Sequence, residues 1–100
     1  MKIEITEVQI VPVKAKEGLV AFASIVFNDG FFLGSIGVHS KLDGTGFRLT
    51  YPTKKVGNRN INIYHPINKV VSQAIEDAVF GKLKDVMTYL DDRYSSFKST

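Results

Sequence analysis

The chain has no cysteine, and its 100 residues include only two histidines and three prolines. Without cysteine there is no disulfide framework, no cysteine-ligated zinc site and no cysteine nucleophile. His39 and His65 lie far apart in the sequence, whereas a metal site needs three or four clustered ligands. We therefore expect no metal and no other cofactor. The absence of cysteine also fits a reducing cytoplasm, where we expect the protein to be located.

A long apolar run is also missing. No stretch approaches the 18 residues of a membrane-spanning helix. The first residues, MKIEITEVQIVPV, alternate polar and apolar side chains and have no continuous apolar core like that of a signal peptide. The sequence predicts no membrane partner. It predicts a single domain over residues 1–94, followed by a flexible tail over residues 95–100.

Signatures of catalysis are missing as well. None of the serines at positions 24, 35 and 40 lies in a GxSxG strand–turn–helix motif. Glu76 and Asp77 are adjacent on a predicted helix, so their carboxylates point apart. No glycine spacing matches a phosphate-binding loop. We therefore expect neither enzyme activity nor a small-molecule substrate.

Acidic residues are absent from one stretch, residues 44–75. It carries five basic side chains, whereas residues 1–43 carry four basic against five acidic side chains and residues 76–93 carry three against five. The five basic residues are Arg48, Lys54, Lys55, Arg59 and Lys69. Such a local excess of positive charge is typical of proteins with an anionic partner. A solvated loop without function would account for the charge equally well.

Five strands are predicted from the alternation and clustering of apolar residues, at 2–13, 18–28, 31–38, 47–51 and 60–64. In the first strand the apolar positions change parity, which indicates a bulge near Thr6–Glu7. Gly34 and Gly37 indicate a bulge or a close backbone approach in the third. Residues 52–60 are either a loop or an extended hairpin tip.

Three residues are predicted to have a structural role in the turns between sheet and helix. Pro52 begins the loop or hairpin of residues 52–60. His65 and Pro66 end the fifth strand, because a residue before proline favours an extended conformation. We expect His65 to hold this turn rather than to act in catalysis.

Residues from 69 onward predict one long helix, because apolar side chains recur there at steps of three and four. Asn68 is the expected N-cap. A helix of about 25 residues is longer than is needed to cover one face of a small sheet. Together with the aromatic residues Phe22, Phe27, Phe31 and Phe32 around one hairpin, this length indicates a second subunit. The predicted fold is therefore α+β: an antiparallel sheet of four to five strands followed by one long C-terminal helix, two-layered and dimeric.

The basic residues favour nucleic-acid binding. Lys54 and Lys55 suit phosphate oxygens, and Arg59 suits either a phosphate or a guanine edge. Lys69 lies at the predicted helix start, where backbone amides also favour a phosphate. A different class of function stays open: a protein-interaction module whose charge is incidental.

The segments FRLTYPTKK, INIYHPIN and IEDAV, in this order and spacing, resemble the SpoVG family, the stage V sporulation protein G or septation regulators of bacteria. The resemblance covers about residues 1–90. It implies an α+β homodimer without catalysis that binds DNA, and RNA in some members, through Lys54, Lys55 and Lys69. Family members often have a longer acidic or glycine-containing insertion where this chain has the more basic segment VGNRN. We therefore expect a nucleic-acid sequence preference that differs from theirs.

Overall fold

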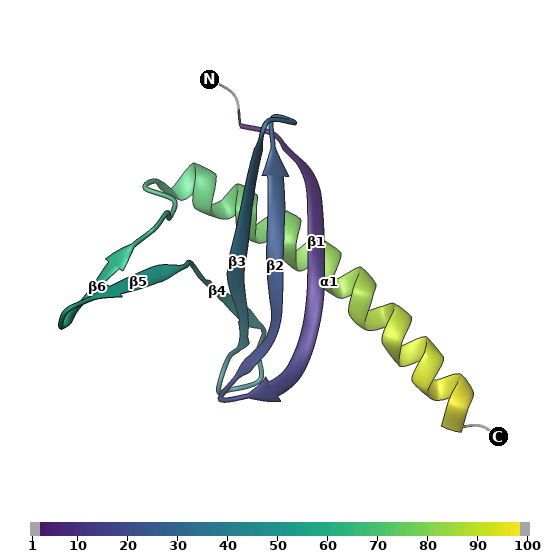
Figure 1. The fold of residues 1–100 in the computed structure, drawn as a ribbon. Coiled ribbons are helices and arrows are strands. Elements are labelled where there is room, and N and C mark those ends of the chain that lie inside the picture. Colours follow the sequence, from purple (N-terminus) through teal and green to yellow (C-terminus); the bar gives the residue numbers. More distant parts are fainter. Residues whose placement is uncertain (1–2, 99–100) are drawn as a thin grey trace.

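The computed structural model describes the backbone of residues 3–98 and the side chains of residues 3–86. Within this part, six strands precede one helix: β1 (Ile5–Lys16), β2 (Leu19–Phe27), β3 (Phe31–Ser40), β4 (Phe47–Thr50), β5 (Thr53–Val56), β6 (Arg59–Asn62) and α1 (Lys69–Lys98). Strands β1 to β4 form an antiparallel sheet in chain order, and β5 and β6 form a separate two-stranded sheet. The predicted α+β class is confirmed (Figure 1).

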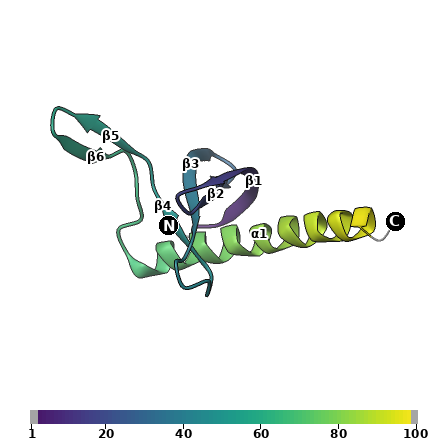
Figure 2. The ribbon, with the colours of Figure 1, turned by 90° about the horizontal axis from the view of Figure 1, so that it is seen from below.

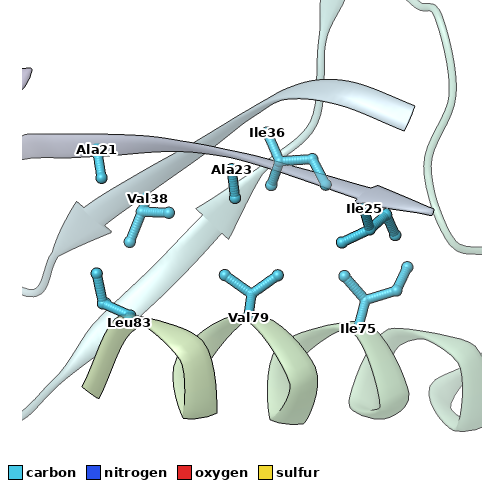
Figure 3. Packing of buried hydrophobic residues seen from close by; sticks show 8 residues of the cluster. All are labelled: Ala21, Ala23, Ile25, Ile36, Val38, Ile75, Val79 and Leu83. Carbon is cyan, nitrogen blue, oxygen red and sulfur yellow. The ribbon is translucent and has the colours of Figure 1, made fainter. Parts of the chain in front are cut away.

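Helix α1 crosses one face of the four-stranded sheet and makes the second layer of the fold (Figures 1 and 2). Eight buried apolar side chains form the core between the layers: Ala21, Ala23, Ile25, Ile36, Val38, Ile75, Val79 and Leu83. The three from the helix recur at four-residue steps and so share the face that meets the sheet (Figure 3). The predicted apolar face of the helix is confirmed as far as Val86; Met87 and Leu90 lie outside the described side chains.

The helix begins where the sequence predicts. The side-chain Oδ1 of Asn68 accepts a hydrogen bond from the backbone N–H of Val71 at 2.9 Å, and its carbonyl accepts one from Ser72 at 3.1 Å. This is the geometry of an N-cap, which satisfies backbone donors that have no partner inside the helix.

Two predicted bulges are confirmed. Between β1 and β2, Ile5 pairs with Phe27 but Glu7 pairs with Val26, so β1 carries one extra residue. The extra residue reverses the alternation and brings Ile5, Val8 and Ile10 all against the core. In β3 the extra residue falls at Gly34–Ser35, where Ser35 has a φ of 62°.

The predicted fifth strand, residues 60–64, is observed with different bounds. Strand β6 spans Arg59–Asn62 and pairs only with β5, so the main sheet has four strands. The physical reason is Pro52, which has no N–H to donate and so interrupts the chain between β4 and β5. Of the two alternatives for residues 52–60, the extended hairpin is the one observed.

Helix α1 has 30 residues, about 45 Å of helix, and it continues past the β1 edge of the sheet (Figures 1 and 2). The radius of gyration is 15.4 Å, against about 13 Å for a spherical domain of this length. The helix reaches Lys98 and so includes most of the stretch predicted as a tail; residues 99–100 lie outside the described part. The division into a domain over 1–94 and a flexible tail stays a prediction. No helix in the described part has the length and apolarity to cross a bilayer.

Candidate nucleic-acid interface

The β5–β6 hairpin projects from the body of the protein beyond β4, away from the other strands and from the middle of α1 (Figures 1 and 2). Its two strands are joined at Gly57–Asn58, where Gly57 has a φ of 62°, a backbone conformation that glycine adopts without strain. Every residue of both strands is exposed. Lys54, Lys55 and Arg59 therefore extend into solvent from one protruding ribbon.

The pairing of the two strands divides the ribbon into two chemically different faces. Four cross-strand pairs fix the register: Thr53 with Asn62, Lys54 with Ile61, Lys55 with Asn60, and Val56 with Arg59. Because side chains alternate along a strand and paired residues share a face, one face holds Thr53, Lys55, Asn60 and Asn62. We call this the polar face. The opposite, mixed face holds Lys54, Val56, Arg59 and Ile61.

The two adjacent lysines thus point in opposite directions. The sequence presents Lys54 and Lys55 as one basic pair, whereas the strand separates them and places Lys54 with Arg59. The alternation on either side of the Gly57–Asn58 turn was a signal that could have predicted this separation.

Two other predicted site residues lie off the ribbon. Arg48 is exposed on β4 and pairs with His39 of β3, so it belongs to the four-stranded sheet. Lys69 is the first residue of α1 and is exposed. It lines a shallow surface depression together with Gln73 and Asp77, so a carboxylate shares its surroundings. The structure therefore brings together Lys54, Lys55 and Arg59 but neither Arg48 nor Lys69.

Tyr64 anchors the base of the hairpin to the main sheet. Its hydroxyl donates a hydrogen bond to the carbonyl oxygen of Gly34, at the β3 bulge, over 2.5 Å. Its ring meets that of Tyr51 edge-on, with centroids 6.0 Å apart. The N–H of Ile63 donates to the carbonyl of Pro52 at 3.0 Å, which closes the hairpin at its base. Sequence analysis did not single out Tyr64, because its partner is 30 residues away in the chain.

The turn from the hairpin into α1 passes through His65 and Pro66. His65 is exposed, and its Nδ1 lies 3.0 Å from the carbonyl oxygen of Pro66, a distance that suits an Nδ1–H donor. With Tyr64, both residues line an almost wholly apolar pocket of about 340 Å³ between the sheet and the start of α1. The structural role of Pro52, His65 and Pro66 stays a prediction.

The titration behaviour of this region reflects burial. Burial, with a further contribution from nearby Glu76, raises the pKa of Tyr51 to about 12. Burial also raises the pKa of Tyr64. Both phenols therefore stay neutral at physiological pH. Among the described residues, no three metal-ligating side chains gather into a possible metal site.

Comparison with known proteins gives a consistent result. The family model described as SpoVG matches residues 3–85. A protein of Finegoldia magna named "Putative septation protein SpoVG" is 36% identical over 84 residues, which cover 82% of this chain and 75% of that protein. A protein of the same name from Alkaliphilus oremlandii is 30% identical over 81 residues, covering 79% of this chain and 84% of its own length.

Proposed function

Because the chain belongs to the SpoVG family, we propose that it is a regulatory protein of bacterial septation that acts by binding nucleic acid and has no catalytic activity. The resemblance implies DNA as the ligand, and RNA for some members. In this proposal the protein works in the cytoplasm, where the bacterial chromosome lies, and it needs no cofactor.

The observation that carries the proposal is the protruding basic hairpin. Lys54, Lys55 and Arg59 extend from it into solvent, and residues 44–75 contain no acid to neutralise them. Positive charge on a protruding ribbon lowers the electrostatic energy of a nearby phosphate backbone and releases its counterions. Arg48 and Lys69 are further proposed contacts, at the sheet and at the helix start.

The test is the salt dependence of binding to random-sequence duplex DNA. A dimer that presents two such hairpins would neutralise on the order of four to eight phosphates, so log K against log salt should fall with a slope of roughly −4 to −7. Replacing Lys54 and Lys55 with Ala should weaken binding to all sequences and flatten this slope. The matched control is Lys14→Ala with Lys16→Ala, which removes the same charge from exposed positions of β1.

Equal affinity and slope for the wild type and the Lys54/Lys55 variant would refute the proposal. The protein-interaction module would then be the better function, and Val56 and Ile61 would support it, since they are 50% and 49% exposed on the same hairpin.

We also propose that the protein is a homodimer. The sheet face opposite α1 carries Phe22, which pairs with Val11 on one side and Gly37 on the other. Phe22 is 42% exposed and Val11 is 61% exposed. Phe32, 66% exposed, pairs with Val26 on the same sheet. Exposed apolar side chains that adjoin in this way support a contact with a second subunit, and a two-fold pair is the commonest assembly.

Light scattering at micromolar concentration tests the dimer, which should have about twice the 11.1 kDa mass of the chain. Phe22→Ser should shift the population to monomer. Leu42→Ser is the control, because Leu42 is fully exposed in the β3–β4 connection. A wild-type protein that is monomeric at this concentration would contradict the proposal.

A further inference from the structure

The two faces of the β5–β6 hairpin differ in what they offer a ligand. The polar face consists of two amides, one hydroxyl and one ammonium group: Asn60, Asn62, Thr53 and Lys55. Within the described part of the chain, none of these side chains forms a hydrogen bond with another protein group. Their donors and acceptors are therefore free for a partner. The mixed face combines two cations with two aliphatic side chains.

The dimensions of the hairpin suit the major groove of duplex DNA. Its strands lie about 4.8 Å apart, and four residues of strand span about 14 Å. The major groove of B-DNA is about 12 Å wide and 8.5 Å deep and admits a two-stranded ribbon. The hairpin protrudes from the rest of the fold (Figure 2), and every residue of its two strands is exposed, so it is accessible to such a groove.

The polar face has the chemistry for contact with base edges. An asparagine amide can donate to N7 and accept from N6 of the same adenine in a bidentate contact, whereas lysine suits O6 and N7 of guanine. Amide N–H donates to adenine N7, and amide oxygen accepts from the N6 amino group. Asn60 and Asn62 are two residues apart on one strand, about 7 Å, so they meet different base pairs.

The mixed face suits the phosphates at the rims of the groove. Lys54 belongs to β5 and Arg59 to β6, so one cation lies at each edge of the ribbon. Their long side chains can extend outward to the two phosphate backbones. The reverse orientation would press Val56 and Ile61 against base edges and leave the hydrogen-bonding groups of those edges without partners, which is unfavourable.

We infer that the β5–β6 hairpin enters the major groove of duplex DNA with its polar face toward the bases, where Asn60 and Asn62 contact adenines, while Lys54 and Arg59 bind phosphates. This inference rests on the proposed nucleic-acid binding and assigns sequence recognition to the amides rather than to Arg59. Duplex RNA is excluded as the preferred ligand, because its major groove is too deep and narrow for side chains to enter.

The experiment begins with selection of duplexes from a random DNA pool by the wild-type protein. The affinity for a selected duplex is then compared with that for a scrambled duplex of equal length, as a selectivity ratio. Asn60→Ala and Asn62→Ala should each lower this ratio by roughly 5- to 150-fold, with the scrambled-duplex affinity and the salt slope unchanged. Lys54→Ala should lower the affinity for both duplexes equally and reduce the slope of log K against log salt by about 1.

Asn58→Ala is the matched control, because it removes the same amide from the turn, outside both faces. It should leave the selectivity ratio unchanged. All of these positions are exposed, so unfolding temperatures should match the wild type, which separates lost contacts from lost folding.

The outcomes separate this inference from the function on which it rests. If the wild type binds no nucleic acid, the proposed function fails. If it binds but both Asn variants keep the wild-type ratio, or Arg59→Ala alone abolishes it, the polar face does not contact bases. Binding to an RNA duplex of the selected sequence as tight as to the DNA would equally overturn the major-groove contact.

Discussion

The hydroxyl of Tyr64 donates a hydrogen bond to the carbonyl oxygen of Gly34, and this bond joins the base of the basic hairpin to the bulge in β3. The bulge makes the bond feasible, because the extra residue at Gly34–Ser35 interrupts the regular pairing with β2. The hairpin therefore has a fixed point of attachment in the main sheet, even though both of its strands are solvent-exposed.

Tyr64→Phe should lower the free energy of unfolding by about 0.5–1.5 kcal/mol, the usual net value of one hydrogen bond. The ring contact with Tyr51 is retained in this variant, so the loss reports the hydroxyl alone. Urea unfolding at neutral pH measures it. An unchanged midpoint would mean that the bond contributes nothing in solution.

Tyr51→Phe should not lower the free energy of unfolding, in contrast to Tyr64→Phe. The Tyr51 hydroxyl is buried and has no hydrogen-bond partner among the side chains and backbone that the structure describes. Removal of an unsatisfied buried polar group is expected to leave stability unchanged or to raise it by up to about 1 kcal/mol. The same urea titration serves as the measurement, and Tyr64→Phe is the matched comparison, since each variant removes one phenolic oxygen. A clear loss of stability would show that Tyr51 has a partner after all.

Stability should also fall at alkaline pH. The pKa of Tyr51 is about 12 in the folded protein, above the ordinary tyrosine value of about 10, so the unfolded chain loses this proton first. The contribution of Tyr51 is therefore complete below pH 10 and is lost as the pH rises from 10 to 12. Tyr64, whose pKa is also raised, adds to the same fall. Unfolding free energies measured between pH 8 and 12 should decline less steeply for Tyr51→Phe than for the wild type.

Asn68→Ala should destabilise the protein by about 0.5–2 kcal/mol, because it removes the oxygen that caps α1. Asn68→Ser is the control: serine supplies an equivalent acceptor and should restore most of the loss. Thermal unfolding followed by circular dichroism distinguishes the two. If serine and alanine were equally damaging, capping would not be the cause.

Two glycine substitutions should act in opposite directions. A Cβ at Gly37 would lie 2.5 Å from Oγ1 of Thr50 and 3.0 Å from Nε2 of His39, two atoms that are themselves 3.0 Å apart. Gly37→Ala should therefore cost about 1–3 kcal/mol. Gly81 lies inside α1 with open space around it, so Gly81→Ala should stabilise by about 0.5–1 kcal/mol. Chemical denaturation of both variants provides the comparison.

The sequence predicted those features that depend on near neighbours in the chain. The β1 bulge followed from the changed parity of apolar residues, and the start of α1 followed from Asn68 and the change of period. The partner of β6 could not be predicted in this way, because pairing depends on where Pro52 turns the chain. Nor could the contact between Tyr64 and Gly34, which exists only after the sheet has formed.

The candidate site shows the same limit. The distribution of charge along the sequence located the basic stretch and its residues Lys54, Lys55 and Arg59. Strand alternation alone separates Lys54 from Lys55, but the placement of Arg59 on the face of Lys54 required the register of the hairpin. A displacement of one residue would have placed Arg59 with Lys55. Whether Lys69 and Arg48 join them depends on tertiary placement, and the structure holds both on other elements.

The order of the elements along the chain also has a consequence for biosynthesis. Ribosomes complete the four-stranded sheet at Thr50, but the helical residues that cover it, Ile75 to Leu83, are translated later. At about 5–20 residues per second, roughly two to seven seconds separate Thr50 from Leu83. The segments leave the ribosome in the same order and with the same delay, so the emerged sheet exposes Ile25, Ile36 and Val38 on one side and Phe22 on the other before the helix covers the first side. A chain terminated before Leu83 would stay in this aggregation-prone state, so premature stop codons late in the coding sequence should yield insoluble fragments.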